Sequence, residues 1–411
     1  MRQLLKRAGT LTLLFAVMCS ILVSCRTQPE PAPPEPEPAP EQTEPEPAED
    51  VISIENYPVE HETEFGGIYI KISIDDFNSL GFQYGDSVDV LFSNGYTLED
   101  IPYYNGYYVD AGQPLLIAYP GYAYIKAAVN YGEDLWETAG LKSELRVSLW
   151  AQSGTDEHST ATVRLREQGK YLDIQQARDI SYSDDRTKYP SDEVFANFRN
   201  VSVGNIPDGV FYRSASPCDN QHQRAAYVDD FIGEAGVKAI LNLSDNEAKI
   251  EGYISREDFD SPYFLSLYED GKVIPVGLSM NYLSTEFASR IADGFIALTA
   301  TDGPFLVHCT EGKDRTGFVC MLIEALAGAS YQEIADDYML TYDNYYEITR
   351  EKDRAKYDTI LEKNLDAMLK TVVGDETVDI KSADLAPYAR QYLVRAGMTE
   401  EEVDAFLNRI T

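Results

Sequence analysis

The chain has 411 residues, of which 69 are acidic and 34 are basic, so its formal net charge at pH 7 is −35. That length is enough for two or three domains. Such a negative charge argues against nucleic acid or an anionic membrane surface as a general partner, because both would repel the chain. A phosphate site in this chain must therefore hold its ligand through local contacts.

Residues 1–24 predict a signal peptide. A basic start precedes the apolar stretch 11–23, which is too short to span a membrane comfortably. The segment then ends in Leu22-Val23-Ser24-Cys25, which resembles the lipobox of bacterial lipoproteins. This resemblance implies that Cys25 is lipidated and that the mature protein is extracytoplasmic, held at the bacterial cell membrane by its lipid anchor only. The alternative is a plain transmembrane anchor.

Residues 25–52 predict a tether behind that anchor. Between positions 28 and 50 there are nine prolines and seven glutamates, and no basic residue. Such a segment buries no core, and its prolines and like charges keep it extended.

Residues 53–167 predict a small, mostly β domain, either a barrel or a sandwich. Short β-branched or aromatic runs at 68–72, 88–92 and 115–119 are separated by Gly, Asn and Asp turn signals. The tyrosines of its loops either form a contact surface or simply pack and cap the strands. These tyrosines are Tyr103, Tyr104, Tyr107, Tyr108, Tyr122 and Tyr124.

Parts of this β segment resemble the C-terminal domain of the S-adenosylmethionine hydroxide adenosyltransferases. The likeness is carried by Glu64-Phe65-Gly66-Gly67, by Gly85-Asp86-x-Val88-x-Val90 and by the stretch 121–142. Nothing in the chain resembles the N-terminal catalytic half of that family, so adenosyl chemistry is not implied. The resemblance implies an accessory or binding module whose ligand is unknown.

Residues 168–411 predict an α/β domain with a central, largely parallel sheet. After a polar connection at 166–195, apolar strands alternate with periodic helices. We expect strands at 237–243 and 305–308. We expect helices at 285–300, 318–327, 331–341, 356–373, 384–396 and 400–410.

The stretch 305–317 holds the strongest chemical signal. An apolar strand ends in His308-Cys309, and Arg315 follows six positions after the cysteine, just before an apolar helix. Where a strand turns into a helix, the N–H groups of the loop bind anions, and a cysteine there meets a potential that favours its thiolate. Arginine holds phosphate with a planar fork of donors. The pattern therefore predicts a nucleophile, an anion cradle and a cation within thirteen residues.

This stretch resembles the signature of the protein tyrosine phosphatase superfamily, His308-Cys309-x5-Arg315-Thr316. Its second half is similar to a bacterial branch of relaxed specificity, which acts on phosphotyrosine and sometimes on phosphoinositides. Two further blocks, Asn197–Val201 and Gly209–Ala215, are similar to the opening of that branch. The resemblance covers about residues 190–411. It implies a phosphatase that works through a cysteinyl-phosphate intermediate and uses no metal or other cofactor.

We assign roles within the motif on chemical grounds. Cys309 is the expected nucleophile, and Arg315 with the loop N–H groups stabilises charge on the phosphoryl oxygens. Thr316 donates a hydrogen bond to the thiolate, and His308 orders the loop rather than contacting substrate. The remaining phosphate-binding loop residues are Thr310, Glu311, Gly312, Lys313 and Gly317.

The leaving oxygen needs a general acid. Asp314 is the first candidate because it stands beside Arg315, Asp245 is the second, and Asp302 is the third. In the resembling family a strand ends in Asp-Leu-Arg. This chain has Asn242 there, and an amide cannot donate a proton as a carboxylic acid does.

The presence of Lys313 in the loop is compatible with more than one class of substrate. As a second cation beside the phosphate it would suit inositol phosphates or phosphoinositides as well as phosphotyrosine; otherwise it is solvated or pairs with Glu311. The leading expectation is phosphotyrosine hydrolysis, with phosphoserine, phosphothreonine and phosphoinositides as further substrates. The alternatives are an inositol-polyphosphate phosphatase and a phosphate-capturing binding protein. The expected partner is a phosphorylated peptide or a small phosphate ester.

Other cysteines, arginines and histidines are expected to be structural. Cys218 is either a resolving partner or a plain turn cysteine, and Cys320 is a small hydrophobe within a helix. Arg199 and Arg213 are expected to form ion pairs. The four histidines show no metal-ligand spacing; they are His61, His158, His222 and His308.

Overall fold

The computed structural model describes residues 52–63, 66–141 and 159–411. The predicted signal peptide, Cys25 and the tether up to residue 51 lie outside these residues. Over the described ranges, no helix combines the length and apolar character needed to cross a membrane.

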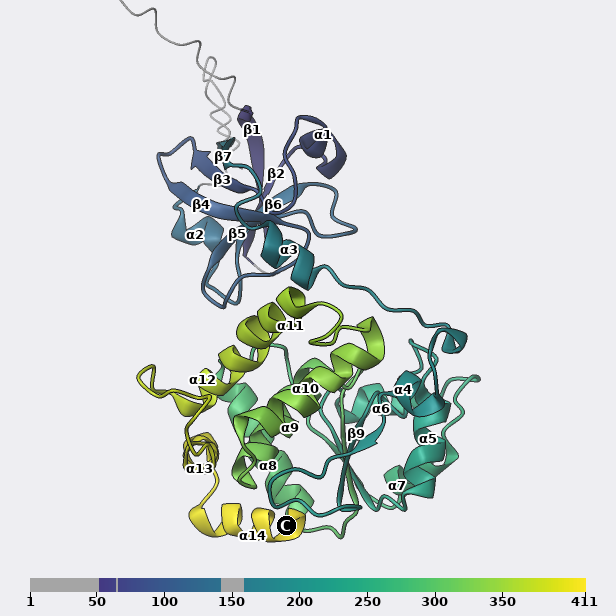
Figure 1. Cartoon of the computed structure of the whole chain (residues 1–411). Helices are drawn as coiled ribbons and strands as arrows, with labels where there is room; N and C mark the ends of the chain where they lie inside the picture. The colour runs from purple at the N-terminus through teal and green to yellow at the C-terminus, as the bar shows by residue number, and fades with distance from the viewer. Residues whose placement is uncertain (1–51, 64–65, 142–158) are drawn as a thin grey trace, which may run out of the picture. The chain divides into compact units, whose positions relative to one another are not determined.

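The β part is a closed barrel of seven strands, in the order β1-β2-β6-β5-β4-β3-β7 (Figure 1). It closes because β7 pairs with both β1 and β3. Of the two predicted forms, the barrel is therefore the right one. The strands are β1 (Ser53–Glu62), β2 (Gly67–Ile70), β3 (Ser87–Phe92), β4 (Thr97–Tyr104), β5 (Pro114–Ile117), β6 (Ile125–Val129) and β7 (Thr160–Glu167).

Alternation along the strands builds the interior of this barrel. In β3, Val88, Val90 and Phe92 are buried while the residues between them are partly exposed, as the two-residue period of a strand requires. Tyr103 and Tyr104 are buried at the end of β4, so these two tyrosines pack rather than offer a surface. Three helices accompany the strands: α1 (Ile74–Ser79), α2 (Leu135–Thr138) and α3 (Leu172–Arg178).

Helix α3 lies in the stretch that was predicted as a polar connection. Ile174 and the preceding Tyr171 pack against a buried cluster of the barrel that contains Tyr104, Leu115 and Ile117. This helix has only two turns, so its apolar residues are too few to produce a periodic signal in the sequence.

The C-terminal part is built on a five-stranded sheet in the order β11-β10-β12-β9-β8. Its four longer strands pair in parallel and only β8 is antiparallel, which confirms the predicted α/β domain with a largely parallel sheet. The strands are β8 (Arg199–Asn200), β9 (Phe211–Ser214), β10 (Ala239–Asn242), β11 (Val273–Pro275) and β12 (Phe305–His308).

Helices cover both faces of this sheet (Figure 1). Leu241 and Val307 face a core formed with α8, α9 and α10, whereas the adjacent Ile240 and Leu306 face a second core formed with α5, α6 and α7. The helices are α4 (Asp192–Ala196), α5 (Ala225–Glu234), α6 (Glu247–Ile254), α7 (Pro262–Glu269), α8 (Thr285–Thr299), α9 (Asp314–Leu326), α10 (Tyr331–Tyr346), α11 (Arg354–Ile360), α12 (Ala367–Val373), α13 (Ala386–Ala396) and α14 (Glu400–Ile410).

The predicted helices are found, with three informative differences. Helix α9 begins at Asp314, four residues before the apolar run, because the end of the loop already takes helical geometry. The helix predicted at 356–373 contains a π-helical turn, Leu361–Asp366, between α11 and α12. Helix α10 continues to Tyr346, five residues beyond its predicted end, and ends at Glu347 in left-handed geometry with φ of 54°.

Candidate functional site

The loop between β12 and α9 lies at the carboxyl end of the central strand of the sheet. Cys309 follows β12 directly, and Asp314 is the first residue of α9. The cysteine is only 3% exposed. Because β9 and β10 flank β12 in parallel, the loops that follow all three strands meet around this cysteine.

Four successive carbonyl groups of the loop accept hydrogen bonds from outside it. The carbonyl oxygen of Cys309 lies 3.2 Å from His308 Nδ1, and that of Thr310 accepts from the Ser216 N–H at 3.1 Å. The next two carbonyls, of Glu311 and Gly312, accept from side chains at 2.7 and 3.0 Å. Each carbonyl is therefore fixed on the outer side of the loop.

This outer attachment turns the N–H groups inward. In a trans peptide the N–H of the next residue points opposite to the carbonyl. The N–H groups of residues 310–313 therefore lie on the inner side, and no hydrogen bond from any of them is found within the described residues. Four unused donors beside Cys309 form a cradle for an anion.

The donors behind the loop come from distant parts of the chain. Tyr345, in the last turn of α10, donates through its hydroxyl to the Glu311 carbonyl at 2.7 Å. Asn197, the left-handed end of α4, donates to the Gly312 carbonyl at 3.2 Å, and Arg213 of β9 donates to the same oxygen at 3.0 Å. None of these residues was assigned to the site from sequence, although Asn197 and Arg213 belong to the blocks that resemble the family.

Arg213 and Arg199 are held by one carboxylate. Asp337 of α10 accepts from Arg199 Nε at 2.8 Å and forms a close ion pair with Arg213. Burial opposes the charge of this carboxyl, but the two guanidinium groups hold the pKa of Asp337 below its usual range. The prediction that both arginines form structural ion pairs is confirmed.

Gly312 is required at its position in the loop. Its φ is +68°, and a Cβ there would lie 2.2 Å from the carbonyl oxygen of Ser214. Any side chain at position 312 would push the loop away from β9, the strand that pairs with β12.

Arg315 and Thr316 keep polar groups unused. Arg315 donates to the Leu278 carbonyl at 3.2 Å and to Thr310 Oγ1 at 3.3 Å, which fixes the plane of its guanidinium. Its buried Nε has no hydrogen-bond partner among the described residues, and neither has the buried hydroxyl of Thr316. Buried polar groups in folded proteins are normally satisfied, so unpartnered donors at one place indicate a ligand site.

His308 is fully buried under the loop. A carbonyl only accepts, so the contact with the Cys309 oxygen places a proton on Nδ1. Burial lowers the pKa of His308 to about 4, and the ring is neutral at pH 7. This geometry supports an ordering role for the histidine.

Lys313 is engaged within the protein. Its ammonium lies 3.2 Å from Glu311 Oε2 and 3.7 Å from Asp314 Oδ2, and it donates to the Tyr346 hydroxyl at 3.0 Å. Burial disfavours the ammonium, yet the charges of Asp314 and Glu311 raise the pKa of Lys313 well above its usual value. Of the alternatives for this lysine, the structure shows the pairing with Glu311.

The three candidate acids lie in very different places. Asp314 is partly exposed at the first turn of α9. Asp245 is buried near the end of β10, where its carboxylate accepts from Ser244 Oγ at 2.8 Å. Asp302 precedes β12 and pairs with Arg409, so it lies at the opposite end of the strand from Cys309. The structure excludes Asp302 from the site.

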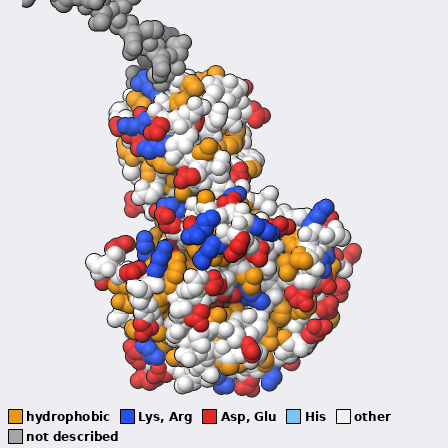
Figure 2. Space-filling model, in the orientation of Figure 1, with side chains coloured by type: hydrophobic (Ala, Val, Ile, Leu, Met, Phe, Trp, Pro, Cys, Tyr) orange, Lys and Arg blue, Asp and Glu red, His pale blue; other side chains and the backbone are white. Residues whose placement is uncertain are grey.

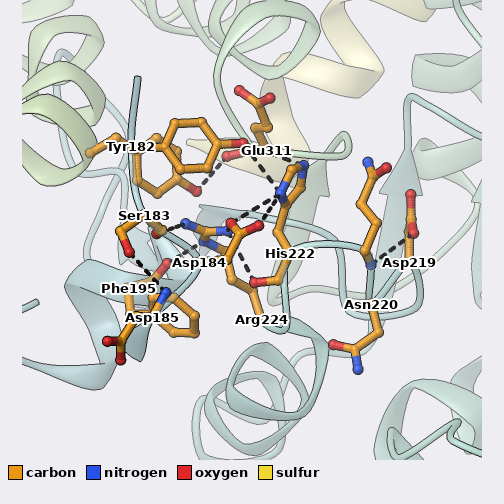
Figure 3. Close-up of polar contacts among 12 residues, drawn as sticks. Tyr182, Ser183, Asp184, Asp185, Phe195, Asp219, Asn220, His222, Arg224 and Glu311 are labelled. Atoms are coloured by element: carbon orange, nitrogen blue, oxygen red, sulfur yellow. Dashed lines mark hydrogen bonds and ion pairs between the residues drawn. The ribbon is translucent and has the colours of Figure 1, made fainter. Parts of the chain in front are cut away.

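A further polar cluster stands beside the loop (Figure 3). His222 Nδ1 lies 3.1 Å from Asp184, which also pairs with Arg224 at 2.9 Å. Burial would raise the pKa of Asp184, but these two partners lower it. Figure 3 shows Tyr182 and His222 pointing toward Glu311. Sequence reasoning missed this cluster because its members come from two segments about forty residues apart and match no motif.

The other two cysteines among the described residues, Cys218 and Cys320, are free and buried. Cys218 lies 3.5 Å from Ser216 Oγ, and burial raises its pKa to about 12. Burial also raises the pKa of Cys320 inside α9. Neither environment favours a thiolate, which agrees with a turn cysteine for Cys218 and a small hydrophobe for Cys320.

Charge around the site is mixed. On the face shown in Figure 2, carboxylates are spread over the α/β domain, while Lys and Arg side chains gather near α11. Within the part of the chain that the structure describes, no group of three or more His, Cys, Asp and Glu side chains is arranged to hold a metal ion.

One comparison with known proteins locates its match in the chain, over the α/β domain. A family model described as the tyrosine phosphatase family matches residues 193–411. The chain is similar to the "Triple specificity protein phosphatase PtpB" of Mycobacterium tuberculosis, with 30% identity over 115 residues, 28% of this chain and 40% of that protein. It is also similar to a "Tyrosine-protein phosphatase" of Nostoc commune, with 26% identity over 130 residues, 27% of this chain and 42% of that protein.

The chain thus spans about two fifths of the length of these curated relatives. Among solved structures, it matches the core catalytic domain of the PP-IP phosphatase SIW14 from S. cerevisiae in complex with citrate. That match has 23% identity and a TM-score of 0.25, and it covers 43% of this chain and 91% of the other.

Proposed function

Because the chain belongs to the tyrosine phosphatase family, we propose that it is a cysteine-dependent phosphatase acting on phosphotyrosine. The observation that carries this proposal is the loop around Cys309. Four inward N–H groups, the unused Arg315 Nε and a buried cysteine converge at the carboxyl end of β12. A phosphoryl group needs donors around its equatorial oxygens and a nucleophile in line with the leaving oxygen.

The first step transfers the phosphoryl group to the protein. The Cys309 thiolate attacks phosphorus, an S–P bond forms and the ester O–P bond breaks. The leaving oxygen takes a proton from a general acid, for which we propose Asp314, since it is partly exposed beside Arg315. The cradle and Arg315 stabilise the charge on the three equatorial oxygens.

The second step releases phosphate. Water attacks phosphorus, the S–P bond breaks, and the carboxylate of Asp314 accepts the proton of the water. The cysteine leaves as a thiolate, and Thr316 donates its hydroxyl to it. The unpartnered, buried Oγ1 of Thr316 supports this role.

The engagement of Lys313 supports a single phosphate as the substrate group. An inositol polyphosphate would need several free cations around the cradle. Here Lys313 is paired with Glu311 and Asp314, so it adds no uncompensated positive charge. We therefore place phosphotyrosine first, with phosphoserine, phosphothreonine and phosphoinositides as further substrates, ahead of inositol polyphosphates.

We also propose that the enzyme acts outside the cytoplasm, anchored through lipidated Cys25 and raised from the membrane by the tether that follows. The basic start, the apolar stretch 11–23 and the lipobox-like residues support this location. The barrel is proposed as an accessory module, similar to the C-terminal domain of the adenosyltransferases, with a ligand still to be found. Labelling with radioactive palmitate, compared with Cys25→Ala, tests the anchor.

The function is tested by phosphate release from four substrates: a phosphotyrosine peptide, a phosphoserine peptide, a phosphoinositide and inositol hexakisphosphate. The protein is the chain from Asp50 onward, with Cys309→Ser as the matched control. We expect release from the phosphotyrosine peptide and none with Cys309→Ser. If the folded protein releases phosphate from none of the four, the loop only captures phosphate and the enzyme proposal fails.

A further inference from the structure

Glu324 is a buried acid that the proposed chemistry does not use. Eleven residues of α9, from Thr316 to Leu326, are buried, and Glu324 is the one charged side chain among them. Within the described residues, no donor reaches its buried Oε1. Burying an ionised carboxylate without a partner is so costly that such a group normally takes up a proton.

Glu324 lies on the face of α9 along which the Arg213 side chain runs. Gly317, Cys320 and Glu324 are spaced by three and four positions, so they share one face of the helix. A Cβ at Gly317 would lie 3.9 Å from Arg213 Nη2, which places the guanidinium beside the first residue of this row. Helix α10, which carries Asp337, packs against α9.

The carboxyl group of Glu324 hydrogen-bonds to that of Asp337. Two carboxyl groups share a hydrogen bond only when one of them carries a proton. The guanidinium groups of Arg199 and Arg213 keep Asp337 ionised, so the proton belongs to Glu324. Burial and the charge of Asp337 accordingly raise the pKa of Glu324 well above its usual value.

From Asp337 the contacts continue to the phosphate-binding loop. Asp337 forms a close ion pair with Arg213, and Arg213 Nη2 donates to the Gly312 carbonyl at 3.0 Å. Because this carbonyl is held on the outer side, the N–H of Lys313 points into the cradle. With Glu324 neutral, two guanidinium groups stand against one carboxylate, and one net positive charge remains behind the cradle.

We propose that Glu324 is a positioning residue for the anion cradle. As a neutral acid it donates to Asp337, which in turn holds Arg213 against the Gly312 carbonyl. The inference rests on the proposed function, because it takes the cradle as the site of the phosphoryl group. It adds a side chain of α9 that acts on the loop donors only through Asp337 and Arg213.

Binding of inorganic phosphate tests the cradle without turnover. Glu324→Met keeps the length of the side chain but cannot donate, so the Kd for phosphate, measured by calorimetry, should rise about fivefold. This is less than the loss of a direct hydrogen bond to a charged group would give, because Arg199 and Arg213 still hold Asp337. Glu324→Gln keeps a donor and should recover most of the affinity, and kcat for p-nitrophenyl phosphate should follow the same order.

Asp229→Leu is the matched control. This buried carboxylate of α5 accepts from the N–H groups of Tyr263 and Phe264 at 3.0 and 2.6 Å, and neither belongs to the loop. Its loss should lower the Tm and leave the Kd for phosphate unchanged. An unchanged Kd in Glu324→Met, or an equal rise in Glu324→Gln, would overturn the inference.

Infrared spectroscopy tests the proton itself, even if Glu324→Met does not fold. Wild-type protein at pH 7 should show the C=O band of a buried carboxylic acid, and Glu324→Gln should lack it. Absence of this band from wild type would also overturn the inference. If wild type releases phosphate from no ester, the proposed function fails, while the Kd comparison and the band still decide the role of Glu324.

Discussion

The barrel and the phosphate-binding loop differ in how fully their buried polar groups are hydrogen-bonded. In the barrel, Asp86 is fully buried and accepts from the N–H groups of Gln83 and Gly169, both at 2.8 Å. Among the described residues, all eight buried side-chain nitrogen and oxygen atoms without a hydrogen-bond partner lie in the α/β domain. His308, Arg315 and Thr316 contribute three of them, and a fourth, Glu311 Oε2, is held by the ion pair with Lys313. Satisfied polar groups hold a fold together, whereas unsatisfied ones gathered at one place mark where a ligand completes the structure.

The largest effect on kcat is expected from substitution of Arg315, the cation of the loop with an unpartnered Nε. Arg315→Lys keeps the charge but loses the planar fork, so kcat for p-nitrophenyl phosphate should fall about a thousandfold, as for the loss of an oxyanion donor. Steady-state kinetics measure this change. A fall of less than about tenfold would show that the fork does not hold the transferred phosphoryl group.

Next in size is the general acid. Asp314→Asn should lower kcat about a hundredfold on phenyl phosphate, whose leaving group needs a proton, and much less on p-nitrophenyl phosphate. Asp245→Asn is the matched control, because that carboxyl is buried and bonded to Ser244. If Asp245→Asn shows the leaving-group dependence and Asp314→Asn does not, the assignment is wrong.

The third largest effect is expected from the side chains that donate hydrogen bonds to the loop carbonyls. Asn197→Ala removes the side-chain hydrogen bonds to the Glu311 and Gly312 carbonyls, so kcat should fall about tenfold through misplaced N–H groups. Asn200→Ala, an asparagine three positions later that bonds Gly209 away from the loop, is the control and should retain kcat. Equal kcat in both variants would contradict the idea that outer hydrogen bonds orient the cradle.

The buried histidine gives the loop a cost in stability at acid pH. Its pKa is lowered to about 4 in the folded protein, so the unfolded chain binds more protons below about pH 6.5 and stability falls as the pH drops. Between pH 7 and pH 5 the loss is about 2 kcal/mol. Urea unfolding of His308→Gln should show a smaller difference between these two pH values than wild type does.

The smallest effect on catalysis is expected in the barrel. Asp86→Ala removes the acceptor of two backbone N–H groups, those of Gln83 and Gly169, and should destabilise the barrel by about 2 kcal/mol. Because the loop chemistry uses no barrel residue, kcat for p-nitrophenyl phosphate should stay within about twofold of wild type. Thermal unfolding and steady-state kinetics of one preparation measure both effects. A large fall in kcat would contradict the idea that the barrel has no part in the chemistry of the loop.

Local patterns were enough to predict many of the longer elements and the centre of the site. The β-branched runs indicated the barrel strands, the apolar periods indicated α8 and α14, and the strand, loop and helix from 305 to 326 followed from order and spacing alone. Cys309 and Arg315 belong to one short loop, so their meeting depends on geometry within that loop.

The tertiary structure decided everything that depends on partners far along the chain. Asn197 and Tyr345 reach the loop across 114 and 34 residues, and no local pattern records such contacts. The same holds for Asp302, which the sequence placed near the motif but which a strand carries to the far end of the sheet. Lys313 shows the reason most directly. The sequence determines that a cation is present in the loop. Only the packing of α10 against that loop brings Tyr346 beside the ammonium, where together with Glu311 it occupies the donors of Lys313.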